Sequence, residues 1–301
     1  MNKDRFYRVM SAIDPEFLEE AKTPAKKRSP WTGVLAAAAC LFLILGVLYW
    51  QTLTPSVPQQ YGYTLSLPRK ARDVVWTEVH SDPAMLQASF RLDGNSYVCR
   101  TAHTEYQADI SGISGQSVGS MQWQSDDLSL SFQQNSDADS WMSWYDESTG
   151  SLWCLSGSDP VSLLATAGQI VESMGYHMAV VPEGAKDITY HALGLDGHTV
   201  GEVSFVLNKV RWSYRMAATM ELEADFRDIS GQEDAYANES ETQVAWCSAR
   251  LSWNEDGTGK LVWFDLVPGL LYSLTMDSGA SEQALMDMAQ QLYEPAQDDV
   301  G

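Results

Sequence analysis

The longest run of apolar positions extends over residues 31–50, WTGVLAAAACLFLILGVLYW, and contains no charged residue. As a helix rising about 1.5 Å per residue, it would span roughly 30 Å, the hydrocarbon thickness of a bilayer. A buried core helix of this length would normally keep a polar stripe. A cleaved signal peptide would have a shorter apolar core followed by a small-x-small site, which is missing here. The pattern therefore predicts an uncleaved transmembrane signal anchor.

Positive charge lies on only one side of this run. Lys22, Lys26, Lys27 and Arg28 precede it, and no further Lys or Arg follows until Arg69. Basic residues flanking a span stay in the cytoplasm. We therefore expect a protein of the cell membrane, with residues 1–30 cytoplasmic and the C-terminal bulk extracytoplasmic, joined to the span by a Pro-containing linker at 51–60.

The cytoplasmic tail has its own hydrophobic pattern. Its apolar residues follow helical spacing on two short segments, one on each side of Asp14-Pro15: Phe6, Val9, Met10, Ile13, Phe17 and Leu18. Helices this short are marginal alone in water. The stripe therefore predicts docking to a cytoplasmic protein partner or to the membrane surface, and the alternative is a tail with no role.

Beyond residue 60 the pattern changes to short alternating runs with occasional helical segments. Residues 128–132, LSLSF, alternate as a half-buried strand does, and DESTG at 146–150 reads as a hairpin turn. Asp159-Pro160 is typical of a helix start, with Gly175 just past its end. A second helix is predicted near the C-terminus, with these apolar positions: Leu285, Met288, Ala289 and Leu292.

These elements occur twice. The motif DISG at 109–112 recurs at 228–231, and WYD at 144–146 recurs as WFD at 263–265, 119 residues later without a gap. An antiparallel sheet covered by its own helix buries its apolar face. We therefore predict an α+β fold in which two tandem repeats, 61–174 and 175–294, follow the single span, each an antiparallel sheet with a C-terminal helix packed on it. A short tail, 295–301, ends the chain.

Charge and cysteine content narrow the partners. The net charge of the 301 residues is −21: residues 1–30 carry seven basic and five acidic side chains, or +2, and the remainder carries −23. Such a region would be repelled by nucleic acid. Of the four cysteines, Cys40 lies in the span, while Cys99 and Cys154 share one repeat and form a candidate disulfide. The alternative is that they are small buried apolar residues.

The whole arrangement resembles a known family. An amphipathic tail, a basic cluster, one span, a Pro-containing linker and units with W-[YF]-D before a closing helix are similar to an uncharacterised extracytoplasmic domain family of single-pass proteins of Gram-positive bacteria. Some members of this family resemble anti-sigma-factor-like membrane regulators. The resemblance implies tandem extracytoplasmic domains but supplies no catalytic residues.

Candidate chemistry is sparse. Gly115-Gln-Ser117-Val-Gly119 matches the G-x-S-x-G elbow of serine hydrolases, which needs a strand before the serine and a helix after it. Polar flanks favour a loop here. No zinc-ligand or EF-hand spacing is present, so we expect no metal and no cofactor. Trp144 and Trp263 recur in both repeats and should be core residues. The tryptophans without equivalents are the better surface candidates: Trp123, Trp141, Trp246 and Trp253.

The sequence thus favours a non-enzymatic membrane protein that senses or binds an unknown ligand outside the cell and signals through its tail. An envelope scaffold without signalling is the alternative, and a serine hydrolase using Ser117 is the third hypothesis.

Overall fold

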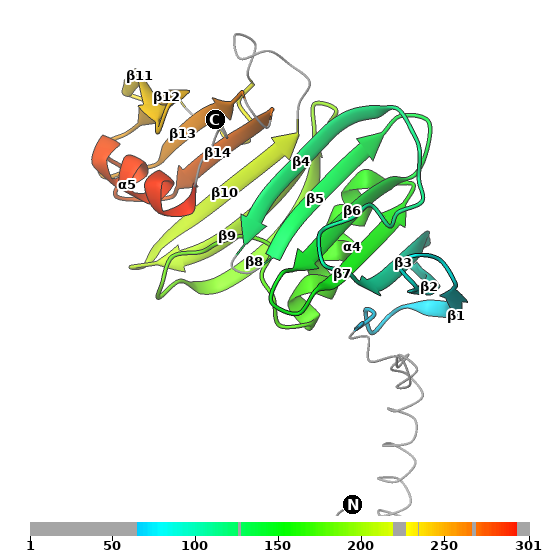
Figure 1. Cartoon of the computed structure of the whole chain (residues 1–301). Helices are drawn as coiled ribbons and strands as arrows, with labels where there is room; N and C mark the ends of the chain where they lie inside the picture. The colour runs from blue at the N-terminus through cyan, green and yellow to red at the C-terminus, as the bar shows by residue number, and fades with distance from the viewer. Residues whose placement is uncertain (1–64, 126–127, 219–226, 234, 267–268, 294–301) are drawn as a thin grey trace, which may run out of the picture. The chain divides into compact units, whose positions relative to one another are not determined.

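The computed structural model describes residues 65–125, 128–218, 227–233, 235–266 and 269–293. They form two antiparallel sheets of seven strands each, and each sheet is followed in the chain by one helix (Figure 1). This agrees with the predicted pair of α+β repeats. The predicted tail, span and linker, and the segment 295–301, lie outside the described residues. Within the described ranges, no helix has the length and apolarity needed to cross a membrane.

The first sheet is built from residues 72–157 in the order β1-β2-β3-β7-β6-β5-β4. Its strands are β1 (Arg72–Val79), β2 (Met85–Leu92), β3 (Asn95–His103), β4 (Ser117–Ser125), β5 (Leu128–Asn135), β6 (Ser140–Asp146) and β7 (Ser151–Gly157). After β3 the chain crosses to the far edge of the sheet and then returns strand by strand. The crossing segment contains the first DISG motif.

The second sheet repeats this topology in the order β8-β9-β10-β14-β13-β12-β11. Its strands are β8 (Lys186–Leu195), β9 (His198–Leu207), β10 (Val210–Ala218), β11 (Asn238–Val244), β12 (Cys247–Trp253), β13 (Gly259–Asp265) and β14 (Leu270–Met276). The crossing after β10 contains the second DISG motif.

Strand register is also repeated. Leu130 pairs with Trp144 in the first sheet, and Ala249 pairs with Trp263, 119 residues further on, in the second. Phe90 opposite Tyr97 likewise corresponds to Phe205 opposite Trp212. A one-residue slip would turn every side chain to the other face. The matched register therefore means that corresponding residues of the two repeats point to the same side of their sheets.

Helix α4 (Pro160–Ser173) begins where the sequence predicted, and a second helix follows near the C-terminus as expected. Helix α4 has Asp159 as its N-cap, whose carboxylate accepts a hydrogen bond from the Ser162 amide at 3.2 Å. Helix α5 (Glu282–Leu292) is capped by Ser281 and buries the four predicted apolar residues. Trp144 and Trp263 are both fully buried, which confirms their core role.

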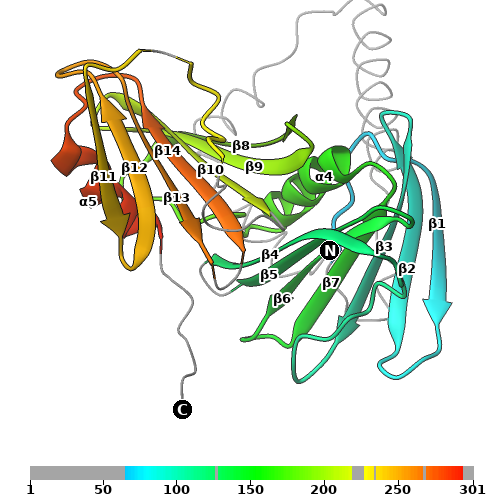
Figure 2. The same ribbon diagram turned by 90° about the horizontal axis from the view of Figure 1, so that it is seen from above.

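Helix α4 packs on both sheets, against β6 and β7 of the first and against β8 and β9 of the second (Figure 2). A glycine makes the second contact close: a Cβ added at Gly168 would lie 2.5 Å from Cδ1 of Tyr190 on β8. The Tyr190 ring therefore occupies the place of a side chain on the helix. Helix α5 packs on β11, β13 and β14 of its own sheet.

Both repeats have the same polar contact just after their helix. The hydroxyl of Tyr176, just after α4, donates to the Asp146 carboxylate at 2.6 Å, and the Tyr293 hydroxyl, just after α5, donates to Asp265. Burial alone would raise the pKa of Asp146, but hydrogen bonds from Ser148, Tyr176 and Thr149 outweigh it and lower this pKa to about 2. These contacts fasten the segment after each helix to the strand carrying the W-[YF]-D motif.

Candidate functional site

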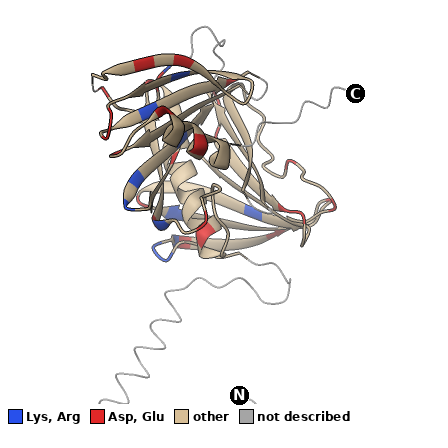
Figure 3. Ribbon diagram, turned by 90° about the vertical axis from the view of Figure 1, so that its left-hand side faces the viewer, with Lys and Arg blue, Asp and Glu red and all other residues tan. Residues whose placement is uncertain are grey.

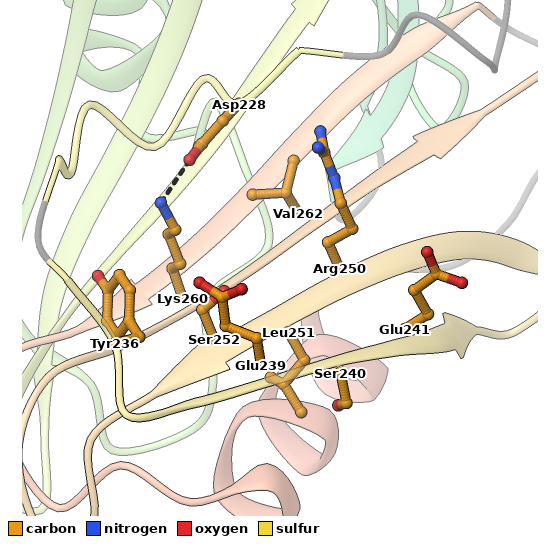
Figure 4. A pocket seen from close by; sticks show the side chains of 10 residues that line it. All are labelled: Asp228, Tyr236, Glu239, Ser240, Glu241, Arg250, Leu251, Ser252, Lys260 and Val262. Carbon is orange, nitrogen blue, oxygen red and sulfur yellow. Dashed lines mark hydrogen bonds and ion pairs between the residues drawn. The ribbon is translucent and has the colours of Figure 1, made fainter.

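The candidate site lies on the face of the second sheet away from α5. Side chains from β11, β12 and β13 form two rows across this face, since Glu239 lies opposite Ser252, which lies opposite Lys260. In the next row Glu241 lies opposite Arg250, which lies opposite Val262. The rows line a hollow of about 420 Å³ whose further wall is formed by Asp228 and Tyr236 (Figure 4).

Lys260 holds the wall of this hollow in place. Its Nζ lies 2.6 Å from Oδ2 of Asp228, donates to the Gln232 carbonyl at 3.0 Å, and lies 5.1 Å from the centre of the Tyr236 ring. Burial would raise the pKa of Asp228, but hydrogen bonds from Lys260 and Ser230, together with the positive charge of Lys260, lower it below its usual value. One ammonium group thus joins three points of the crossing segment to β13.

The base of the same segment is held by Arg215 on β10. Its Nη1 donates to the carbonyls of Ile229 and Ser230, at 3.0 and 2.7 Å, and its Nε lies 3.5 Å from the Glu202 carboxylate. Gly231 allows this approach, because its φ is +67° and a Cβ there would lie 2.6 Å from Nη1 of Arg215. The DISG motif is therefore a backbone loop shaped to receive a guanidinium group.

The first repeat uses the same device with one difference. Arg100 donates through Nη1 to the carbonyls of Ile110 and Ser111, and a Cβ at Gly112 would again lie 2.6 Å from the guanidinium. Its Nε donates to the neutral amide oxygen of Gln87 at 2.9 Å, where Arg215 meets a carboxylate. The loop anchor is thus common to both repeats and structural in origin.

The charged rows, in contrast, belong to the second repeat alone. In the first sheet the positions 119 residues earlier, which have the same register, carry no charge: Ser120, Gln122, Ser131, Gln133, Trp141 and Ser143. Figure 3 shows how the acidic and basic positions of the second sheet fall on neighbouring strands. Because the backbone is the same, the difference lies in the chemistry of the two faces.

A second hollow, of about 460 Å³, lies where β3 ends and is lined by residues that include Asp82, His103 and Tyr106. Tyr106 is 71% exposed, and its backbone carbonyl accepts a hydrogen bond from the Thr104 hydroxyl at 2.7 Å.

The structure does not contain the candidate disulfide between Cys99 and Cys154. Cys99, Cys154 and Cys247 are free and buried. Cys99 lies directly opposite Leu155, so the neighbouring Cys154 points to the other face of the sheet. Burial raises the pKa of the Cys99 thiol to about 12 and that of Cys154 well above its usual value, which keeps both thiols protonated and unreactive.

The G-x-S-x-G motif lacks the context of a nucleophile elbow. Ser117 is the first residue of β4, so a strand follows it where the elbow requires a helix. Its hydroxyl lies 3.5 Å from the Gly119 carbonyl, within the motif itself.

The unmatched tryptophans divide differently from the prediction. Trp123 donates to the Met178 carbonyl at 2.7 Å, and Trp123, Trp141 and Trp253 are partly buried against the core. Trp246 alone of the four is exposed, at 55%, in the two-residue turn between β11 and β12. In the part of the chain that the structure describes, no three His, Cys, Asp or Glu residues form a group that could hold a metal ion.

Sequence reasoning missed the charged rows of the second sheet, although a signal for them was present. Once the gapless match of 119 residues is known, each strand position can be compared with its partner. Lys260 against Trp141, and Arg250 against Ser131, are then changes of charge at fixed places in the fold. The candidate tail residues 6–18 lie outside the described residues and stay a prediction.

Comparison with known proteins adds little. No protein-family model matches the chain. No curated protein matches it. Among solved structures, MucB, described in complex with MucA(peri), is 11% identical over an alignment that covers 74% of this chain and 88% of that one, with a TM-score of 0.22. A similarity this low carries no argument about fold or function.

Proposed function

We propose that this chain is a non-enzymatic, membrane-anchored protein whose extracytoplasmic region binds a partner through the mixed-charge face of its second repeat. One observation carries this proposal: two sheets with the same topology and register differ on three equivalent strands, because β11, β12 and β13 bear charged rows where β4, β5 and β6 bear none. If those charges served solubility alone, the equivalent positions of the first sheet would be expected to carry them.

The construction of the hollow supports binding over simple solvation. Side chains of Asp228 and Lys260 retain only 33% and 15% of their exposure, so their pairing has a desolvation cost that a purely solvated surface avoids. In return, the pair holds Tyr236 and its segment in a fixed wall. A preformed wall lowers the ordering cost of binding a partner.

The chemistry of the face is that of recognition. Carboxylates on β11 stand next to Arg250 on β12, and the phenol of Tyr236 stands at the opposite end of the hollow. Alternating charge of this kind selects partners by complementarity and excludes those whose charges clash. The membrane anchor predicted at 31–50 would hold this face outside the cell.

A photo-crosslinking amino acid at Ser252 tests the proposal in living cells. The matched control is the same amino acid at Gln133, which occupies the equivalent place in the first repeat. We expect a discrete crosslinked product from position 252 and none from position 133. No product at 252, or the same product at both positions, would exclude this face as the partner site.

The signalling part of the proposal is tested by deleting residues 1–22. We expect the deletion to change transcription in the host while leaving the Ser252 crosslink intact. Unchanged transcription and unchanged cytoplasmic pull-downs would remove signalling and leave an envelope scaffold. Release of the intact chain from membrane vesicles by alkaline washing would remove the anchor.

A further inference from the structure

We infer, building on the proposed function, that the partner binds as an additional strand along the edge of β11, and that it is an extended basic segment with Lys or Arg at alternate positions. Strand β11 has an unpaired edge among the described strands, and its exposed side chains are acidic.

Strand β11 is a terminal strand of its sheet. It pairs with β12, and no other described strand pairs with its outer edge. Its residues alternate between exposed and half-buried, and Val244 at its end is its one fully buried residue. An edge with unpaired N–H and C=O groups is a template for one more strand.

The first repeat contacts the second through one face of its own edge strand. Its equivalent edge strand, β4, is met by the second repeat: Trp123 on β4 donates to the Met178 carbonyl at 2.7 Å. A Cβ added at Gly119, also on β4, would lie 3.3 Å from the Cβ of Ala218, the last residue of β10. Both contacts are made from one face of β4, so its outer edge, like that of β11, has no described strand beside it. What separates the two edges is their charge.

Charge indicates which partner can take the place. Glu239 and Glu241 point to one side of β11, while the equivalent residues of β4 are Ser120 and Gln122. A second copy that added its own β11 would set these carboxylates against each other, and like charges on facing strands are destabilising. A segment with a cation at every second residue would pair with both carboxylates. The net charge of −21 would also attract it from a distance.

The opposite side of the strand limits the size of the partner's other residues. Ser240 lies between the two glutamates and points toward α5 (Figure 4), and its buried Oγ has no hydrogen-bond partner among the described residues. A small hydroxyl-bearing residue at the facing position of the added strand would satisfy it. The fitting sequence therefore alternates Lys or Arg with Thr or Ser.

Peptide binding to the full-length chain in a neutral detergent tests the inference by fluorescence anisotropy. The probes are labelled ten-residue peptides that alternate Lys with Thr, or Glu with Thr. We expect the Lys peptide to bind more tightly and to weaken with added salt. The double reversal E239K/E241K should weaken Lys-peptide binding by roughly tenfold and favour the Glu peptide. The matched control S120K/Q122K should change neither affinity.

Backbone pairing is tested separately with N-methylated Lys peptides. Methyl groups on one set of alternate residues block the edge that would face β11, and methyl groups on the other set leave it free. We expect one peptide to lose binding and the other to keep it. Equal binding of both would overturn strand addition. Equal binding of the Lys and Glu peptides, or no binding of either, would overturn the basic partner.

These outcomes are distinguishable from failure of the proposed function. A Ser252 crosslink that persists in E239K/E241K cells, together with failure of the Lys peptide, would leave the binding face standing and remove the strand-addition mode. Absence of the position-252 crosslink in cells that carry no other substitution would remove both the binding face and the strand-addition mode.

Discussion

Replacing Arg215 by methionine should destabilise the second repeat by about 3–5 kcal/mol. The guanidinium donates to two carbonyls, those of Ile229 and Ser230, and both residues are buried. Hydrogen bonds from charged donors contribute roughly 1.5–3 kcal/mol each and are not fully additive. The substitution also leaves the Glu202 carboxylate, only 15% exposed, without its cation.

The first repeat provides the internal control. Arg100 makes the same two bonds, but its third partner, Gln87, is neutral, so no buried carboxylate is left behind when Arg100 becomes methionine. We expect R100M to cost about 1–2 kcal/mol less than R215M, because an uncompensated buried charge adds its own penalty.

Urea unfolding followed by tryptophan fluorescence and circular dichroism measures both variants. In thermal unfolding each kcal/mol should lower the midpoint by roughly 2–4 °C for a region of this size. Equal losses for R100M and R215M would refute the role given to Glu202. If the free energy of unfolding of R215M lay within about 0.5 kcal/mol of the parent value, the range of an ordinary surface substitution, the stabilising role of Arg215 would be refuted.

Three further predictions concern charge and thiols. Ionised Asp146 should stabilise the fold fully above pH 3.8 and lose this contribution as the pH falls toward 2. The parent should therefore lose stability in that interval, whereas D146N should be less stable but should depend less on pH there. Urea midpoints between pH 2 and 5 measure both. K260M should release the segment that carries Asp228, so limited proteolysis at residues 232–237 should become faster. The free energy of unfolding should fall by about 1 kcal/mol. Cys99 and Cys154 should react with a thiol reagent once the protein is denatured, without prior reduction. A mass of the untreated protein lower by two hydrogen atoms, as a disulfide would give, would contradict this.

Periodicity in the sequence was enough to predict the repeats and their helices. The 119-residue match from the DISG motif onward preserves strand register, because one inserted residue would turn the core face of each later strand to solvent. Asp159 and Pro160 mark the start of α4 because the cap and the missing amide act locally. Features of this kind depend on residues that are close together in the chain, so they can be predicted from the sequence.

The candidate site depends on contacts between residues far apart in the chain, and the sequence alone does not show which strands bring them together. The crossing after β10 carries Asp228 over strands that come later in the chain, and only the strand order tells that Lys260 lies beneath it. Cys99 and Cys154 illustrate the same limit: their separation in the chain fits a bridge, but their positions on neighbouring strands put them on opposite faces. Composition cannot tell which face a residue takes when the strand pairing is unknown.

The contact of Tyr190 with Gly168 has a consequence for how this protein can be divided. Because α4 packs on the sheets of both halves, the two halves share one hydrophobic interior. A fragment that stops after α4 would leave one flank of that helix wet, and a fragment that starts after it would leave β8 and β9 bare. Duplication has here produced two copies that can no longer be separated without damage to either.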